Sequence, residues 1–133
     1  MKTLVLDLET QKMVEDWAKP WEAGLSCCGV WISWLGGSDG RLRLFGADDV
    51  ERIVQLIEAA DEVVSWNGHR FDLPLLGGLH GKSFHVKSHF DFLAVIRSTT
   101  GIRHRLEDVG RLTLGRGKTG KGSSAPGLWQ RRD

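Results

Sequence analysis

The chain has no tyrosine, only two cysteines and three prolines in 133 residues, and no long hydrophobic run. The cysteines, Cys27 and Cys28, are neighbours, and neighbours on a strand point to opposite faces, so we expect no disulfide between them and two small core residues in a reducing compartment. No apolar stretch approaches the roughly 20 residues of a membrane-spanning helix. The N-terminus is too short and turns acidic too soon for a signal peptide. These absences predict a cytoplasmic chain with no membrane partner.

Charge is unevenly distributed along the chain. Residues 97–133 hold nine Lys and Arg against three Asp and Glu, whereas residues 1–96 hold nine against fourteen. A basic C-terminal region beside an acidic body suits a phosphate-bearing partner. A solubilising charged tail is an equally open interpretation.

Two carboxylates end a short apolar run near the N-terminus, Leu4-Val5-Leu6-Asp7-Leu8-Glu9-Thr10. Alternate residues of a strand share a face, so Asp7 and Glu9 project the same way, about 7 Å apart along the backbone. Two like charges held beside a core are costly unless a cation or a proton neutralises them. Carboxylate oxygens are preferred ligands of Mg²⁺ and Mn²⁺. The pattern therefore indicates either a metal site or a strand end with two solvated acids.

A second acidic position follows another apolar run. Residues 63–68 predict a strand that enters a turn, and Phe71 and Asp72 follow at the expected start of a helix. A carboxylate is favoured there as a cap and by the helix dipole. Taken alone, Asp72 could therefore be an ordinary N-cap, while together with Asp7 and Glu9 it could complete a site.

Hydrophobic periodicity predicts an α/β domain with a mixed five-stranded sheet flanked by helices. The expected strands span residues 3–9, 27–35, 41–45, 62–66 and 83–86, with turns such as residues 36–40 between them. The expected helices span residues 50–57, 72–79, 91–98 and 106–114. From Gly115 the chain is rich in Gly, Lys and Ser and carries little structural signal.

The two acidic fragments resemble the first two sequence motifs of the DEDD superfamily of 3′–5′ exonucleases, which have a ribonuclease H-like fold. Residues 106–115, 118–122 and 125–130 resemble, more closely, predicted exonucleases related to the proofreading domains of family B DNA polymerases. The resemblance covers nearly the whole chain and implies one exonuclease-like domain over residues 1–133. It also implies that Asp7, Glu9 and Asp72 bind two Mg²⁺ or Mn²⁺ ions.

The chain departs from this family at the fourth acid, which in relatives lies on a C-terminal helix beside a Tyr or a His. We expect that helix to be lacking here, because no matching motif follows residue 130. Asp108 and Asp91 are the candidates for an additional ligand, although the pattern favours Asp108 as a solvated helix residue. Without any tyrosine, His104 is the candidate to orient the attacking water. A partner chain or water could also fill the gap.

The resemblance implies a metal-dependent 3′–5′ exonuclease acting on single-stranded DNA ends, with RNA as an open alternative. Aromatic faces can stack bases and basic side chains can meet phosphates. The candidate nucleic-acid-binding residues are Thr10, Trp66, Asn67, Phe71, Lys118 and Lys121. Two other functions fit the incomplete motif set: a catalytically impaired nucleic-acid-binding remnant, and a structure-selective endonuclease.

Overall fold

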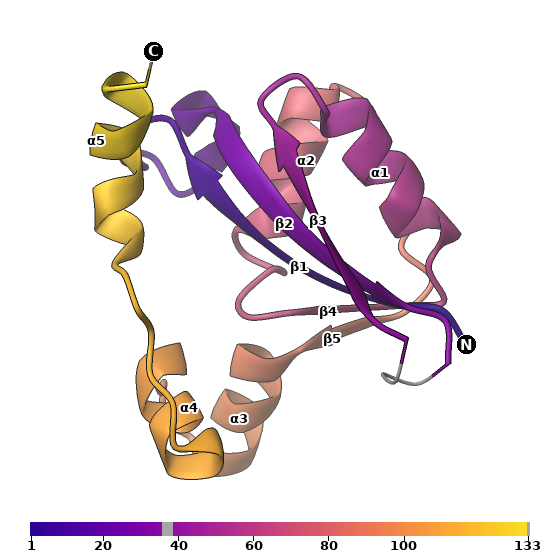
Figure 1. Ribbon diagram of the computed structural model, residues 1–133, viewed down its shortest axis with the longest axis vertical. Helices are drawn as coiled ribbons and strands as arrows, with labels where there is room; N and C mark the ends of the chain where they lie inside the picture. The colour runs from indigo at the N-terminus through magenta and orange to yellow at the C-terminus, as the bar shows by residue number, and fades with distance from the viewer. Residues whose placement is uncertain (36–38, 133) are drawn as a thin grey trace.

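Five strands form one mixed sheet in the computed structural model, which describes residues 1–35 and 39–132 (Figure 1). The strands are β1 (Thr3–Thr10), β2 (Leu25–Ser33), β3 (Arg41–Gly46), β4 (Glu62–Ser65) and β5 (His89–Asp91). Their order is β3-β2-β1-β4-β5. The β1 strand pairs antiparallel with β2 and parallel with β4, so it occupies the centre of the sheet. The predicted mixed sheet is confirmed, and the expected turn over residues 36–40 falls largely outside the described residues.

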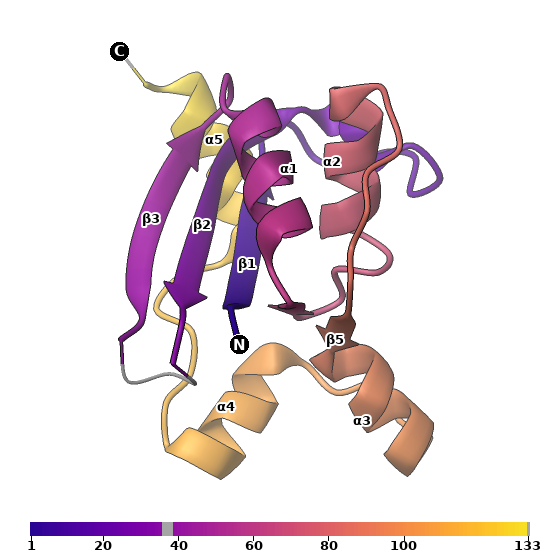
Figure 2. The same cartoon turned by 90° about the vertical axis from the view of Figure 1, so that its right-hand side faces the viewer.

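Helices cover both faces of this sheet. They are α1 (Val50–Ala59), α2 (Asp72–His80), α3 (Phe92–Thr100), α4 (Leu106–Leu114) and α5 (Ala125–Gln130), with short 3₁₀ turns η1 (Pro20–Ala23) and η2 (Gly122–Ser124). Figure 2 shows α1 and α2 in front of the strands and α5 behind them, where α5 packs against β1 and β2. The α3 and α4 helices extend below the sheet in both views. Within the described part of the chain, no helix has the length and apolar content needed to cross a bilayer.

Alternation along β1 decides which face each side chain occupies. Leu4, Leu6 and Leu8 are buried and join the core formed with α1 and α2. Because successive residues point to opposite faces, Asp7 and Glu9 lie on the other side of the same strand. The core therefore fixes the strand that presents both acids.

The two cysteines also follow this alternation. Both are free; Cys27 is exposed and Cys28 is buried in the core. Burial, followed by the nearby Asp72 and Asp7 carboxylates, raises the pKa of the Cys28 thiol to about 12. The expected lack of a disulfide between them is confirmed, whereas the expectation that both are core residues is wrong for Cys27, which lies on the other face of β2.

The fifth strand was predicted at residues 83–86, and that prediction is wrong. The strand is His89–Asp91, which pairs in parallel with β4. Phe84 and Val86, whose alternation suggested a strand, pack at the edge of the hydrophobic core instead. Because β5 is parallel to β4, it must begin at the same end of the sheet. The segment after α2 therefore returns to that end as a loop before β5 starts.

The C-terminal region holds more structure than its composition predicts. Ala125–Gln130 forms α5, which begins with Pro126 in its first turn. Proline suits that position because its missing N–H would have no partner within the helix. Six residues are too few to display a helical period, and the helix is stabilised by packing on the sheet rather than by its own pattern.

Candidate active site

A cavity of about 460 Å³ lies where β1 ends and α2 begins. We call it the carboxylate cavity, because Asp7, Glu9 and Asp72 all line it. Six further residues predicted for the site also line it: Thr10, Trp66, Asn67, Phe71, His104 and Lys118. Residues separated by more than 100 positions in the sequence therefore meet at one place.

Asp7 and Glu9 form a like-charged pair on the wall of this cavity. Enclosure by the protein raises the pKa of Asp7, although the Lys118 ammonium opposes this effect. Burial raises the pKa of Glu9 as well, and the Asp7 carboxylate raises it further. Both groups are thus easier to protonate than in water, and a positive charge near them is favoured.

Asp72 is the most unusual group in the site. It is only 1% exposed, and its Oδ1 atom has no hydrogen-bond partner among the described residues. Burial, followed by the Asp7 charge, raises the pKa of Asp72 to about 7. An unpartnered buried carboxylate oxygen costs free energy, so its retention calls for a proton or a cation at that position.

The alternative interpretation of Asp72 as an ordinary N-cap is not supported. The N-cap of α2 is Phe71, and no side chain caps this helix. Asp72 is the first residue inside the helix, where the dipole favours its negative form but leaves one oxygen unused. The residue that carries this unused oxygen lines the carboxylate cavity.

The donor chemistry of this cavity fits a divalent metal ion. Three carboxylates line it, and Mg²⁺ and Mn²⁺ prefer such oxygen ligands. However, over residues 1–35 and 39–132, no three His, Cys, Asp or Glu side chains are grouped closely enough to hold an ion as they stand. Metal binding would therefore require these side chains to draw together, with Asp72 supplying an oxygen that is otherwise unused.

A basic segment borders the acids. Lys121 and Lys118 line a second cavity of about 710 Å³ that shares Asp7 and Glu9 with the carboxylate cavity. A Cβ atom placed on Gly122 would lie 3.6 Å from a Glu9 carboxylate oxygen, so this backbone runs close to the acids. The lysine-rich segment that could have been a free linker thus lies beside the carboxylates.

Two of the predicted nucleic-acid contacts also have structural duties. The Thr10 hydroxyl donates a hydrogen bond to the Lys12 carbonyl at 2.7 Å, which shapes the turn after β1. Asn67 adopts a left-handed backbone, with φ of 64°, between β4 and α2. Asn tolerates this conformation better than most residues, so the backbone of this turn alone already favours Asn at position 67.

Asp91, a candidate additional ligand, has both carboxylate oxygens hydrogen-bonded to backbone amides. Its carboxylate accepts hydrogen bonds from the amides of Asn67 at 2.8 Å, His69 at 3.2 Å, Leu93 at 3.1 Å and Ala94 at 3.4 Å. It is the N-cap of α3 and does not line the carboxylate cavity. Its acidic side chain ties the β4–α2 turn to α3.

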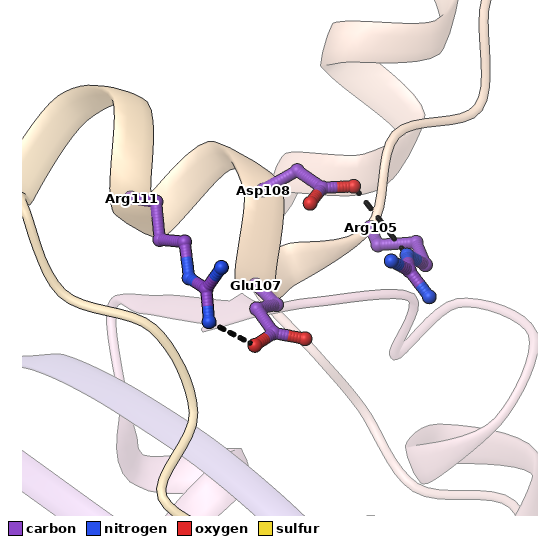
Figure 3. Close-up of polar contacts among 4 residues, drawn as sticks. All are labelled: Arg105, Glu107, Asp108 and Arg111. Atoms are coloured by element: carbon purple, nitrogen blue, oxygen red, sulfur yellow. Dashed lines mark hydrogen bonds and ion pairs between the residues drawn. The ribbon is translucent and has the colours of Figure 1, made fainter.

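Asp108, the other candidate, points away from the site. Figure 3 shows its carboxylate paired with Arg105, at 3.4 Å, while the neighbouring Glu107 pairs with Arg111 at 2.9 Å. Both pairs lie on α4 and its approach, and Asp108 does not line the carboxylate cavity. His104, just before α4, does reach that cavity.

Trp17 and Arg103 are cavity residues that the sequence did not reveal. Trp17 lies in the segment between β1 and β2, and it remains 63% exposed. Its ring lies 5.7 Å from the Phe71 ring. A large aromatic residue in a segment without periodicity was the available signal, because neither a helix nor a strand explains it.

Strand order, the two acids on the central strand and the carboxylate at the start of α2 define an α/β protein of the ribonuclease H-like class. A family model described as the RNase_H superfamily matches residues 41–131, more than half of the chain, and the chain therefore belongs to that superfamily. The match includes Asp72 and begins at β3, so Asp7 and Glu9 precede it. None of the curated proteins compared matches the chain. Membership in this superfamily indicates a nuclease-type activity.

Proposed function

We propose that this protein is a 3′–5′ exonuclease that removes nucleotides from single-stranded DNA ends with the help of divalent metal ions. The observation that carries the proposal is the Asp72 carboxylate, which is buried, has an unpartnered oxygen and lines one cavity with Asp7 and Glu9. The direction of attack, from the 3′ end, rests on the resemblance of the acidic motifs to DEDD exonucleases.

Asp7, Glu9 and Asp72 would hold the metal ions in this proposal. Bound in that way, two ions would supply an activated water and stabilise the negative charge on the leaving 3′ oxygen. His104 lines the same cavity, where it would orient the attacking water. Lys118, beside the acids, would attract the backbone phosphate, and the Trp66 and Phe71 rings would contact bases.

The direct test is digestion of single-stranded DNA labelled at its 5′ end, with Mn²⁺ or Mg²⁺, by the native chain and by Asp7→Asn. A ladder of products that shortens from the 3′ end, and that is missing with the variant, would support the exonuclease. The same oligonucleotide made of RNA shows which sugar is preferred. Unchanged DNA in every lane would refute a nuclease function.

A nucleic-acid-binding remnant is the second candidate, and one observation favours it. No three metal-binding side chains are assembled within the described residues, and neither Asp91 nor Asp108 supplies a fourth acid to the cavity. This function predicts DNA that is retarded in a gel but remains intact with either metal. A structure-selective endonuclease, the third candidate, would cut circular single-stranded DNA, which has no end to digest.

We expect the activity to be higher with Mn²⁺ than with Mg²⁺ at equal, low concentrations. Mg²⁺ demands nearly ideal octahedral geometry, whereas the three acids are not grouped around one point and offer an irregular set of ligands. Initial rates measured at several concentrations of each ion would show a lower half-saturation for Mn²⁺. Identical curves for the two ions would contradict this expectation.

A further inference from the structure

We propose that Trp17, Arg70, Arg97 and Arg103 form a binding track for the part of a single-stranded DNA that lies outside the carboxylate cavity. We call these four residues the arginine track. The inference rests on the proposed function, because it assigns the path of the strand whose end would be cut. In this proposal the arginines contact backbone phosphates and Trp17 stacks on a base.

The track is continuous with the carboxylate cavity. Two further cavities, of about 360 and 370 Å³, adjoin it. Asn67 and Arg103 line all three, so each cavity opens beside the next. Arg70 lines both of the outer cavities, and Arg97 lines the one farther along α3.

The three arginines carry positive charge that the protein does not neutralise. Each is exposed, and no acidic side chain of residues 1–35 and 39–132 forms an ion pair with any of them. Asp91, the acid that lines the same outer cavity, directs its oxygens to backbone amides. By contrast, Arg105 and Arg111 on α4 are paired with neighbouring acids. A planar guanidinium without a partner matches a phosphate with two parallel hydrogen bonds.

Trp17 gives the track a stacking surface. Its ring packs at 5.7 Å from Phe71, with an angle of 52° between the ring planes, yet 63% of the residue stays exposed. Phe71 precedes the buried Asp72, and both rings line the cavity that holds the acids. Base stacking on an aromatic ring tolerates any sequence, as expected for an enzyme that digests strands of varied composition.

The frame that carries the arginines is held by Asp91. Arg70 lies in the turn between β4 and α2, and Arg97 lies on α3. Asp91 accepts hydrogen bonds from amides of that turn and from amides at the start of α3, so it holds together the two segments whose arginines line one cavity. A preformed site of this kind loses less conformational entropy when it binds a strand.

The test is DNA binding by the full chain without hydrolysis. A fluorescent oligonucleotide of deoxythymidines is titrated in EDTA, and anisotropy gives the Kd at several salt concentrations. The first variant is Trp17→Ala. The second replaces Arg70, Arg97 and Arg103 together by Gln, and the third replaces the same three arginines by Lys. A matched control changes three exposed arginines away from the track, Arg41→Gln/Arg43→Gln/Arg52→Gln.

Each phosphate contact contributes about 0.7 to the slope of log Kd against log salt for a single strand. We therefore expect the Gln triple in the track to lower the slope by about 2 and to raise Kd at least tenfold, while the Lys triple keeps the slope. Loss of stacking in Trp17→Ala should raise Kd about tenfold. The control triple should keep the native slope.

Equal slopes for the two Gln triples, or no binding by the native chain, would overturn the track. Far-UV circular dichroism and thermal unfolding check that each variant is folded. Because binding is measured in EDTA, it does not depend on cleavage. A failure to cleave DNA would therefore refute the proposed function but not the proposal that the track binds DNA. Cleavage by the native chain, with equal slopes for both Gln triples, would refute the track alone.

Discussion

Asp72→Asn is expected to make the protein more stable at pH 8 while removing its nuclease activity. Burial and the Asp7 charge raise the pKa of Asp72 from 3.8 to about 7. The carboxylate is therefore an unfavourable group in the folded protein when no metal is present. Asn has nearly the same shape and no charge, so it removes this cost together with a proposed metal ligand.

The direction of the pH effect follows from proton binding. In the unfolded chain Asp72 loses its proton near pH 3.8, but in the folded protein it keeps the proton up to about pH 7. The folded state binds more protons in this range, so the free energy of unfolding falls as pH rises from about 4 to 7. Above pH 7 the full cost is present, and it is absent in Asp72→Asn.

The expected gain is about 2–4 kcal/mol at pH 8, because a pKa shift of one unit corresponds to about 1.4 kcal/mol. Urea unfolding in EDTA at pH 5 and pH 8 measures it, and the gain should be smaller at pH 5. Asp108→Asn, which removes an exposed carboxylate on α4, is the control and should not gain stability at pH 8. A variant at Asp72 that is less stable than the native protein at pH 8 would contradict the argument.

The same variant should lose at least about tenfold in exonuclease rate, because loss of a direct metal ligand should cost no less than loss of an outer-shell partner. It should also lose the stabilisation by Mn²⁺, which for the native chain reaches about 2.7 kcal/mol at one hundred times the Kd. Opposite changes in stability and activity distinguish a functional carboxylate from a structural one, since removing a structural group lowers both.

The sequence predicted the centre of the sheet and its acids well, because both depend on local alternation. Leu4, Leu6 and Leu8 define the buried face of β1, and a period of two then places Asp7 and Glu9 together on the other face. That Asp72 reaches the same cavity was an expectation from resemblance, and the structure places it there. The functional roles of the three acids stay predictions.

Predictions failed where tertiary packing, rather than local pattern, decides the structure. Phe84 and Val86 alternate like a strand but cover the core from a loop, and the strand starts at His89. Asp91 was a candidate metal ligand because its position in the sequence does not show that the Asn67 amide donates a hydrogen bond to its carboxylate. The sequence could not bring together the residues of the proposed arginine track for the same reason, since they come from four separate segments.

Asp91→Ala is expected to destabilise the protein by about 3 kcal/mol and to loosen the turn between β4 and α2. The change leaves four backbone amides without their acceptor, among them the amides of Asn67 and Leu93. Hydrogen bonds to a charged acceptor contribute about 1.5–3 kcal/mol each, and water can replace those near the surface, so the net loss is smaller than their sum. Loss of the α3 N-cap accounts for about 1 kcal/mol of it.

The control is Asp16→Ala, which removes an exposed carboxylate that accepts one amide hydrogen bond, from Ala18 at 2.9 Å. It should cost no more than about 0.5 kcal/mol, as surface substitutions usually do. Urea unfolding gives both values, and hydrogen exchange should show faster exchange at Asn67 and His69 in Asp91→Ala only. Equal losses in the two variants would mean that Asp91 does not hold this turn.

Because Asn67 has a left-handed backbone, which costs about 1–2 kcal/mol for most residues, the turn depends on the Asp91 hydrogen bonds to keep its shape. Asp91, which the sequence offered as a metal ligand, therefore has a structural role: it holds the turn at Asn67, which lines both the carboxylate cavity and the proposed arginine track.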